Sequence, residues 1–405
     1  LPPSATRRWS ADPYPDPRER YGALRDLASA PPDEAANRVL AALKESGLRG
    51  MGGAGFPTGT KWELVRRQER TPKYVVCNAD ESEPGTFKDR VILAELPHLV
   101  IEGMAVAGRT VGAERGILYI RHEYEPERLR FESELADARA AGVLNNFDIE
   151  VFVSPGGYIL GEETALLEAM EDRRGEPRNK PPFPGTHGLF GLPTLINNVE
   201  TLALVPAVLR NGPGWWKAQG KDGHSGLKFM AVSGHVEKPG VYEVPFGTTV
   251  RELIGMAGGV KEGRELLAFA PGGASSNFLP AELADTPIDF AALQQAGSML
   301  GSGALVVVAE GTDLLALAAN VVRFFRNESC GKCVPCRVGS QKAVDLLDAV
   351  LQGRTDRTAL GVLPDLAEAM TLTSICGLGQ VALNPALSVL KHWPGVAKRG
   401  GRKPS

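Results

Sequence analysis

The chain has 405 residues, of which 43% are hydrophobic and 23% charged, and its formal net charge is −3. A chain of this length can form two or three domains with their own cores, and its charge balance provides no basic surface for nucleic acid. No apolar run reaches the ~18–20 residues that a membrane-spanning helix needs. We therefore expect a cytoplasmic protein that binds no nucleic acid and does not insert directly into a membrane.

The first 17 residues contain five prolines and the pair Arg7 and Arg8. They lack the apolar core of a secretory signal peptide. The five cysteines of the chain do not form the disulfide framework of a secreted protein, which also favours a reducing compartment. We expect the N-terminal segment to be an arm that lies over a partner or over its own domain.

The first half of the chain alternates between helical and strand patterns. Pro32 and Gly47 are start and stop signals around a helical pattern at residues 33–46. Another helix is expected to begin at Gly161. Further helices are expected near 59–67, 97–111 and 126–141, and strands at 74–77, 116–120 and 148–153. This alternation predicts an α/β layered domain over residues 1–222.

The second half begins with a segment of turn residues, 220–226, which predicts a linker. Residues 228–236 and 241–244 are expected to pair as a hairpin, and residues 248–255 to form a short helix. This plan predicts a small β-grasp domain over residues 223–305. The remainder, residues 306–405, is predicted to be a helical bundle, with helices near 312–327, 337–352, 356–371 and 382–392.

A glycine-rich loop separates two of the expected helices. Gly50, Gly52 and Gly55 satisfy the pattern G-x-G-x-x-G, but the dinucleotide-binding fingerprint follows a strand, whereas this loop follows a helix. We therefore reject that fold assignment. With Gly53 and Gly59, these glycines leave bare amides ahead of a helix, where a phosphate or a flat ring can approach the backbone. A flexible turn is the alternative interpretation.

Polar side chains follow the strand expected at residues 74–77. The segment Asn78-Ala-Asp80-Glu81-Ser-Glu83 begins where that strand ends, which is where open α/β sheets bind ligands. Carboxylates and amides there could fix hydroxyl groups or a carboxamide, or they could form a solvated acidic turn. The same ambiguity applies to two further pairs, Glu162 with Glu163 and Asn197 with Asn198.

Four cysteines form the most specific pattern in the chain. Cys330, Cys333 and Cys336 have the spacing C-x2-C-x2-C, and Cys376 lies further along the sequence. Three close thiolates and a distant fourth match the ligands of one [4Fe–4S] cluster. The alternatives are structural zinc, which more often uses two separated C-x2-C pairs, and unligated thiols. The fifth cysteine, Cys77, is expected to be a small buried residue at the end of a strand.

Four long motifs together resemble one family. They are Arg49–Gly59 (RGMGGAGFPTG), Cys77–Asp89 (CNADESEPGTFKD), Gly161–Leu166 (GEETAL) and Glu328–Arg337 (ESCGKCVPCR). With them the chain resembles the NADH-oxidising flavoprotein subunit of respiratory complex I, from about residue 20 to residue 395. The same family includes the diaphorase subunits of NAD-reducing hydrogenases and of NAD-dependent formate dehydrogenases.

The resemblance implies three cofactors, FMN, NAD(H) and one [4Fe–4S] cluster. It also implies three parts: an α/β flavin/NADH domain, a small ubiquitin-like β-grasp domain and a C-terminal helical bundle that holds the cluster. Glu83 and Glu163 would be the catalytic residues, because they would position the nicotinamide. The cofactor-binding residues would be Gly50, Gly52, Gly53, Phe56, Lys61, Asn78, Asp80, Glu81, Tyr158, Gly161, Glu162, Lys180, Phe183, Asn197, Asn198 and Thr201. The cluster ligands would be Cys330, Cys333, Cys336 and Cys376.

These cofactors predict the function. NADH gives up two electrons as a hydride, a cluster accepts one electron at a time, and a flavin bridges the two. Since four ligands make one cluster and no second ligand set remains, the electrons must leave to another subunit. We therefore expect a reversible NADH:acceptor oxidoreductase (diaphorase) subunit of a hydrogenase, a formate dehydrogenase or complex I. Its partners would be a thioredoxin-like [2Fe–2S] subunit and further iron–sulfur or catalytic subunits, through which it could lie at a membrane.

Two departures from the family pattern motivate an alternative. Met51 stands where the family usually has arginine, and Leu64 where it often has an aromatic residue. The alternative is a non-catalytic electron-relay or scaffold subunit that retains the cluster but not nucleotide binding. The segments that follow Cys336 and Cys376 favour the soluble hydrogenase and dehydrogenase versions of the family over complex I.

Overall fold

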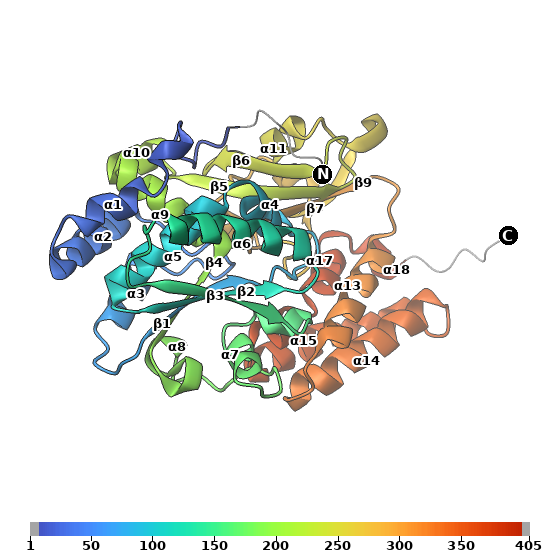
Figure 1. Ribbon diagram of the computed structural model, residues 1–405. Helices are drawn as coiled ribbons and strands as arrows, with labels where there is room; N and C mark the ends of the chain where they lie inside the picture. The colour runs from blue at the N-terminus through green and yellow to red at the C-terminus, as the bar shows by residue number, and fades with distance from the viewer. Residues whose placement is uncertain (1–7, 399–405) are drawn as a thin grey trace.

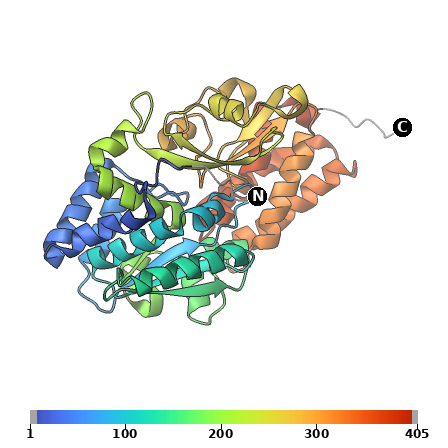
Figure 2. The same cartoon turned by 45° about the horizontal axis from the view of Figure 1, so that its top comes forward.

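The computed structural model of the protein describes residues 8–398. Arg7 of the expected arm therefore lies outside the described residues. Figure 1 shows one sheet with its helices, in blue to green, beneath a second sheet in yellow, and the orange and red C-terminal helices beside both. Figure 2 shows the same three groups from a second direction.

The first sheet has a parallel arrangement. In the described chain its strands lie in the order β3-β2-β1-β4, and every neighbouring pair is parallel. Their bounds are Tyr74–Ala79 (β1), Arg115–Arg121 (β2), Asp148–Ser154 (β3) and Thr194–Asn198 (β4). Val76 and Cys77 face opposite sides of β1, and both are fully buried. Burial on both faces is typical of parallel sheets, and it confirms the interpretation of Cys77 as a small buried residue.

Helices cover both faces of this sheet. Figure 1 shows α4, α5, α6 and α9 between the two sheets, and α7 and α8 on the opposite side of the parallel sheet. The helices of this part are Gly22–Ala28 (α1), Pro32–Ser46 (α2), Thr58–Arg66 (α3), Lys88–Glu95 (α4), Pro97–Val111 (α5), Glu125–Ala140 (α6), Ala165–Met170 (α7), Pro184–His187 (α8), Val199–Asn211 (α9) and Pro213–Ala218 (α10). The predicted α/β layering is confirmed, although the sequence patterns did not identify α4 or β4.

The prediction that a helix begins at Gly161 is wrong. Residues Tyr158–Gly161 form a 3-10 turn, and α7 begins only at Ala165. The reason is the carboxylate of Glu162, which accepts hydrogen bonds from the backbone amides of Thr164 and Ala165, each at 2.9 Å. Glu162 therefore caps the helix from outside rather than lying in its first turn.

The second sheet is mixed. Its strands lie in the order β6-β5-β9-β7-β8 within the described residues, with β5 and β9 parallel and the other pairs antiparallel. The strands are Leu227–Gly234 (β5), Gly240–Pro245 (β6), Leu266–Ala270 (β7), Leu279–Pro280 (β8) and Ala304–Ala309 (β9), with helices Val250–Met256 (α11) and Phe290–Gln295 (α12) between them. The predicted hairpin of β5 with β6 and the short helix that follows it are confirmed.

The C-terminal part is helical and packs against the second sheet. Its helices are Leu314–Glu328 (α13), Val334–Leu351 (α14), Leu363–Thr373 (α15), Gly377–Val381 (α16), Asn384–His392 (α17) and Gly395–Lys398 (α18). Val308 of β9 and Ala270 of β7 share one apolar cluster with these helices, whereas Val307 and Phe269 belong to the core beside the first sheet. The second sheet is therefore buried between the other two parts. The helix predicted over residues 356–371 is instead a 3-10 turn, Arg357–Val362, followed by α15.

The described part of the N-terminal arm lies across the chain itself. The indole of Trp9 donates to the Glu95 carboxylate at 2.7 Å, and its ring packs against Phe229 of β5 at 5.0 Å. The backbone amides of Ser10 and Ala11 both donate to the carboxylate of Glu243 on β6, at 2.6 Å. From Trp9 onwards, the arm thus joins the second sheet to the helices of the first part.

Membrane-spanning potential was assessed over the described residues. By length and composition, no single helix there is able to cross a membrane, and only the sharply bent pair α4 and α5, at 94° to each other, passes the same criterion together.

Candidate cofactor site at the junction of the three parts

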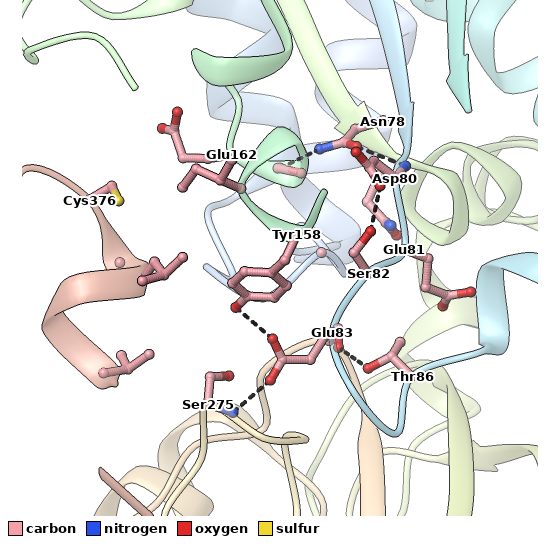
Figure 3. A pocket seen from close by; sticks show the side chains of 18 of the residues that line it. Asn78, Asp80, Glu81, Ser82, Glu83, Thr86, Tyr158, Glu162, Ser275 and Cys376 are labelled. Atoms are coloured by element: carbon pink, nitrogen blue, oxygen red, sulfur yellow. Dashed lines mark hydrogen bonds between the residues drawn. The ribbon is translucent and has the colours of Figure 1, made fainter. Parts of the chain in front are cut away.

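One cavity of about 310 Å³ lies where the three parts of the molecule meet (Figure 3). It falls at the lower end of the volumes that are usual for ligand pockets. From the first part its wall contains Gly52, Asn78, Asp80, Glu81, Ser82, Glu83, Thr86, Asp89, Tyr158, Ile159, Gly161, Glu162 and Asn198. The second sheet and its loops contribute Ser275, Met299 and Ser302, and the C-terminal helices contribute Cys376, Gly377, Leu378 and Val381.

The carboxyl end of β1 supplies the polar wall, as the sequence predicts. Asn78 donates its side-chain amide to the carbonyl of Gly161 at 2.9 Å, and its oxygen accepts the amide of Asp80 at 3.1 Å. The Asp80 carboxylate accepts the hydroxyl of Ser82 at 2.6 Å. Burial raises the pKa of Asp80 to about 6. These bonds fix the acidic wall, so a solvated turn is not the correct interpretation of the segment.

Glu81 has a structural role within the same wall. Its carboxylate accepts the backbone amides of Asp89 and Arg90, at 2.8 and 3.1 Å, and the hydroxyl of Tyr124 at 3.1 Å. It thereby satisfies the first amides of α4, which have no partners inside the helix. Burial, followed by the neighbouring charge of Asp89, holds the pKa of Glu81 well above its usual range.

Glu83 is held between two other parts of the molecule. One carboxylate oxygen accepts the hydroxyl of Tyr158 at 2.7 Å, and the other accepts the backbone amide of Ser275 at 2.6 Å. Figure 3 shows both hydrogen bonds as dashed lines that join Glu83 to Tyr158 and to Ser275. Burial raises the pKa of Glu83. The second sheet therefore orients a carboxylate that belongs to the first part.

Four predicted residues form an ion-pair group next to the cavity. Lys180 contacts Glu162 at 2.8 Å and Glu163 at 3.6 Å, and Lys61 contacts Glu163 at 3.6 Å. Burial lowers the pKa of Lys61, and Glu163 opposes that effect. Only Glu162 of this group lines the cavity itself.

The glycine loop contacts the cavity mainly at Gly52. A Cβ atom at Gly52 would lie 2.9 Å from the Cβ of Asn198. Both residues line the cavity, so any side chain at position 52 would crowd this wall. Gly55 and Gly59 are required by packing instead, because their Cβ atoms would lie 2.9 Å from Phe290 and from Lys44. The loop follows α2 and precedes α3, which confirms the rejection of a Rossmann fingerprint.

Several predicted residues lie outside the cavity wall. Thr201 is fully buried and accepts the Met51 amide at 2.8 Å, and Asn197 accepts the indole of Trp62 at 2.8 Å. Both support the wall from behind. Phe56 and Phe183 are about half exposed, at 47% and 57%. Gly50 and Gly53 also lie outside the wall, together with Lys61, Glu163, Lys180, Cys330, Cys333 and Cys336.

The two residues that motivated the relay hypothesis do not face the cavity. Met51 is 1% exposed and belongs to the hydrophobic core, and Leu64 is 50% exposed on α3. Met51 itself therefore contributes no group to the cavity wall.

The four cysteines of the cluster motif lie near one another at helix ends. Cys333 immediately precedes α14, Cys336 lies in its first turn, and Cys376 immediately precedes α16. Burial raises the pKa of Cys376 to about 11, while the backbone amides of Leu378 and Gly379 lower it. Burial also raises the pKa of Cys336, and the nearby Cys330 adds to the rise of the pKa in both Cys336 and Cys376.

The donor set fits a cluster better than a single ion. In the described chain no three His, Cys, Asp or Glu side chains converge closely enough to hold one metal ion, whereas a tetrahedral zinc site brings every sulfur within ~2.3 Å of one point. The hydroxyl oxygen of Ser374, which is buried beside these cysteines, has no hydrogen-bond partner among residues 8–398. Thiols that are close but do not meet at a point, with an orphaned donor beside them, fit a larger sulfur-containing group.

The sequence patterns missed about half of the cavity wall. Ser82, Thr86 and Asp89 lie inside a quoted motif, so the resemblance contained them without assigning them. Ser275 belongs to the segment Gly272-Gly-Ala-Ser-Ser276, a glycine- and serine-rich turn that could have indicated a close backbone approach. Met299 and Ser302 carry no comparable signal.

Comparison with known proteins assigns the family. The Nuo51 FMN-binding domain matches residues 43–207, the SLBB domain matches 229–277, and the iron–sulfur binding region of NADH-ubiquinone oxidoreductase-F matches 316–399. The F 2 subunit of NADH-quinone oxidoreductase from Rhizobium meliloti is 44% identical over 92% of this chain and 90% of its own length. The chain belongs to this family of NADH-oxidising flavoprotein subunits. Its cofactors are FMN, NAD(H) and a [4Fe–4S] cluster.

Other relatives of this family come from two kinds of complex. The F subunit of NADH-quinone oxidoreductase from Escherichia coli is 40% identical over 97% of this chain and 90% of its own length. The NADP-reducing hydrogenase subunit HndC of Solidesulfovibrio fructosivorans is 41% identical over 91% and 76%. The crystal structure of an NAD+-reducing [NiFe]-hydrogenase in the H2-reduced state has a TM-score of 0.84 at 38% identity. This chain is covered to 92% in that match, and it spans 64% of the hydrogenase chain.

Proposed function

We propose that this protein is the NADH:acceptor oxidoreductase (diaphorase) subunit of a larger assembly. It would exchange a hydride between NAD(H) and FMN and deliver single electrons through its [4Fe–4S] cluster to a partner. One observation carries the proposal: the cavity that contains the predicted flavin residues is also lined by Cys376, a predicted cluster ligand. A shared wall gives electrons a short path from a bound flavin to the cluster.

The chain's own residues would bind and orient the cofactors. In this proposal Gly52 provides a bare surface for the flavin ring, and the oxygens of Asn78 and Asp80 accept hydroxyl groups of the flavin side chain. The remaining wall and supporting residues would keep the roles that the resemblance implies: Gly50, Gly53, Lys61, Glu81, Tyr158, Gly161, Glu162, Asn197, Asn198 and Thr201 around the flavin, and Phe56, Lys180 and Phe183 along the nucleotide. Carboxylates suit hydroxyl and carboxamide donors because an ionised carboxylate only accepts hydrogen bonds.

Glu83 and Glu163 would act by position. Bound FMN supplies the capacity to accept a hydride and release electrons one at a time. Glu83, fixed by Tyr158 and Ser275, would accept a hydrogen bond from the carboxamide N–H and so align the nicotinamide. Neither glutamate needs to act as a base, because the hydrogen leaves the substrate carbon as a hydride and no proton is removed from that carbon. The acidic surroundings favour NADH over the 2′-phosphorylated nucleotide.

The assembly and its location are also part of the proposal. One set of four cysteines holds one cluster, so electrons would pass to a thioredoxin-like [2Fe–2S] subunit or to other iron–sulfur or catalytic subunits. The segments that follow Cys336 and Cys376 favour a soluble, cytoplasmic assembly over complex I. The proposed domains are residues 1–222, 223–305 and 306–405, except that β9, Ala304–Ala309, belongs to the second sheet and extends the second domain to residue 309. The strand order β6-β5-β9-β7-β8 supports a ubiquitin-like β-grasp for that domain.

Anaerobic purification tests the proposal. The expected preparation contains one FMN per chain with iron and acid-labile sulfide in equal amounts, and it reduces ferricyanide with NADH faster than with NADPH. The relay alternative predicts the cluster without flavin and without NADH-dependent reduction. A colourless preparation with one zinc per chain would contradict both.

A further inference from the structure

Ser374 carries a hydroxyl that the protein itself does not use. The residue is 7% exposed and lies between α15 and α16, two residues before Cys376. Its backbone is satisfied, since its amide donates to Met370 at 3.0 Å and its carbonyl accepts the side-chain amide of Gln380 at 3.1 Å. Its Oγ, however, has no hydrogen-bond partner in the part of the chain that the structure describes. A buried hydroxyl without a partner costs about 1–3 kcal/mol, so such groups are rare without a reason.

The Ser374 hydroxyl lies next to Gly379 and Cys336. A Cβ atom placed on Gly379 would lie 2.4 Å from Ser374 Oγ and 2.9 Å from Cys336 Cβ. Ser374, Gly379 and Cys336 therefore meet at one point, and glycine at position 379 is what leaves room for the hydroxyl. The orphaned donor therefore lies beside Cys336, and it precedes Cys376 by two residues in the sequence.

A second serine approaches Cys336 from another segment. Ser329 Oγ lies 3.2 Å from Cys336 Sγ, in the loop between α13 and α14. A thiolate that binds iron has no proton to give, so the hydroxyl must then be the donor. Ser329 also accepts the amide of Gly331 at 3.3 Å, which turns its own hydrogen away from the backbone.

We propose that Ser374 and Ser329 donate hydrogen bonds to sulfur atoms of the cluster and raise its reduction potential. The inference rests on the proposed function, because it requires the [4Fe–4S] cluster in this motif. Reduction adds one electron, and the added negative charge strengthens each O–H···S hydrogen bond. The two serines therefore stabilise the reduced form more than the oxidised form, in the way that hydrogen bonds to sulfur tune iron–sulfur centres. The two serines set the reduction potential of the cluster, and they take no part in the hydride step.

The test compares Ser374→Ala with the unaltered protein, each with FMN and cluster bound. A mediated redox titration followed by electron paramagnetic resonance measures the cluster potential. Iron and sulfide contents should be unchanged, and the equilibrium constant for reduction should fall roughly tenfold, which is 59 mV for a one-electron couple. Thr373→Ala is the matched control, because it removes an exposed hydroxyl from the same helix end, one that bonds to Ala369. That control should leave the potential unchanged.

Two further measurements make the result decisive. The Ser329→Ala, Ser374→Ala double variant should shift the potential further in the same direction. Electron–nuclear double resonance of the unaltered protein should show proton couplings to the reduced cluster that are lost in deuterated buffer, and Ser374→Ala should lack one of them. An intact cluster with an unshifted potential and an unchanged proton coupling would overturn this inference alone. Absence of the cluster from the unaltered protein would overturn the proposed function and this inference together.

Discussion

Lys228 and Glu200 form an ion pair across the boundary between the two sheets, with Nζ and Oε2 at 2.5 Å and both side chains fully buried. Lys88 contacts the same Glu200 oxygen at 2.9 Å. Lys228 also donates to the carbonyl of Ser302 at 3.1 Å, and Ser302 lines the cavity. The pair therefore fastens the second sheet to the first part at the edge of the cofactor cavity.

Lys228→Met should destabilise the protein strongly. In the variant the buried carboxylate of Glu200 keeps Lys88 but loses Lys228. Removing one partner of a buried ion pair costs about 3–5 kcal/mol. Thermal unfolding of the two proteins at one pH and one FMN concentration measures the loss. Lys221→Met is the control, because Lys221 pairs with Glu252 at the exposed surface, where such pairs contribute little. Equal midpoints for Lys228→Met and the unaltered protein would contradict the role of the pair.

Glu83→Gln should impair nucleotide oxidation without loss of flavin. Glutamine presents one accepting oxygen where the carboxylate presents two, so it cannot satisfy Tyr158 and Ser275 and also align a carboxamide. We expect kcat/KM for NADH to fall at least about tenfold, a loss of about 1.4 kcal/mol of transition-state stabilisation. Steady-state kinetics and flavin analysis check this. Glu265→Gln, at an exposed position, serves as the control, and a normal kcat/KM in Glu83→Gln would refute the proposed role.

Gly52→Ala should lower flavin occupancy. The new Cβ would lie 2.9 Å from Asn198 Cβ, so it would displace a wall residue and enter the cavity. We expect the variant to fold but to bind FMN at least about tenfold more weakly, as measured by titration of the flavin-depleted protein. Gly214→Ala is matched to it, because a Cβ at Gly214 in α10 meets nothing within 4 Å. The prediction is wrong if the two variants retain flavin equally.

The stability of the protein should fall as the pH rises from about 4.5 to about 7, in part because of Glu102. This residue is buried and accepts the Tyr14 hydroxyl at 2.9 Å and the Leu24 amide at 3.0 Å. Burial raises the pKa of Glu102 to about 7 from the usual 4.5. The folded state therefore binds a proton that the unfolded state has released, and this stabilisation is present below pH 4.5 and lost as the pH passes 7.

Glu102→Gln isolates that contribution, because glutamine resembles the neutral acid. Its unfolding midpoint should depend less on pH than that of the unaltered protein, by an amount equivalent to ~3 kcal/mol between pH 4.5 and pH 7. Unfolding curves at both pH values provide the measurement. Identical pH profiles for the two proteins would exclude Glu102 as the source.

The sequence predicted those site residues that belong to local patterns, and it missed those that reach the cavity only through tertiary packing. Asn78 and Asp80 follow a strand whose pattern is clear, and the cysteine spacing is itself a local signal. Ser275 and Met299 could not be identified, because they reach the cavity only through the packing of the second sheet against the first part. The late start of α7 depends on which way the Glu162 side chain turns, and the helical pattern carries no information about that. Likewise α4 was missed because its amphipathic pattern is weak and Glu81, eight residues away from Asp89, caps it.

The proposed function requires that a bound flavin and the cluster exchange electrons across the cavity wall that they share. Anaerobic rapid mixing of the purified protein with NADH, followed by absorbance and freeze-quenched electron paramagnetic resonance, tests it most directly. The flavin absorbance should bleach first, and the signal of one reduced [4Fe–4S] cluster per chain should follow. A flavin that bleaches while the cluster stays oxidised, although chemical reductant reduces it readily at the same potential, would rule out this electron path.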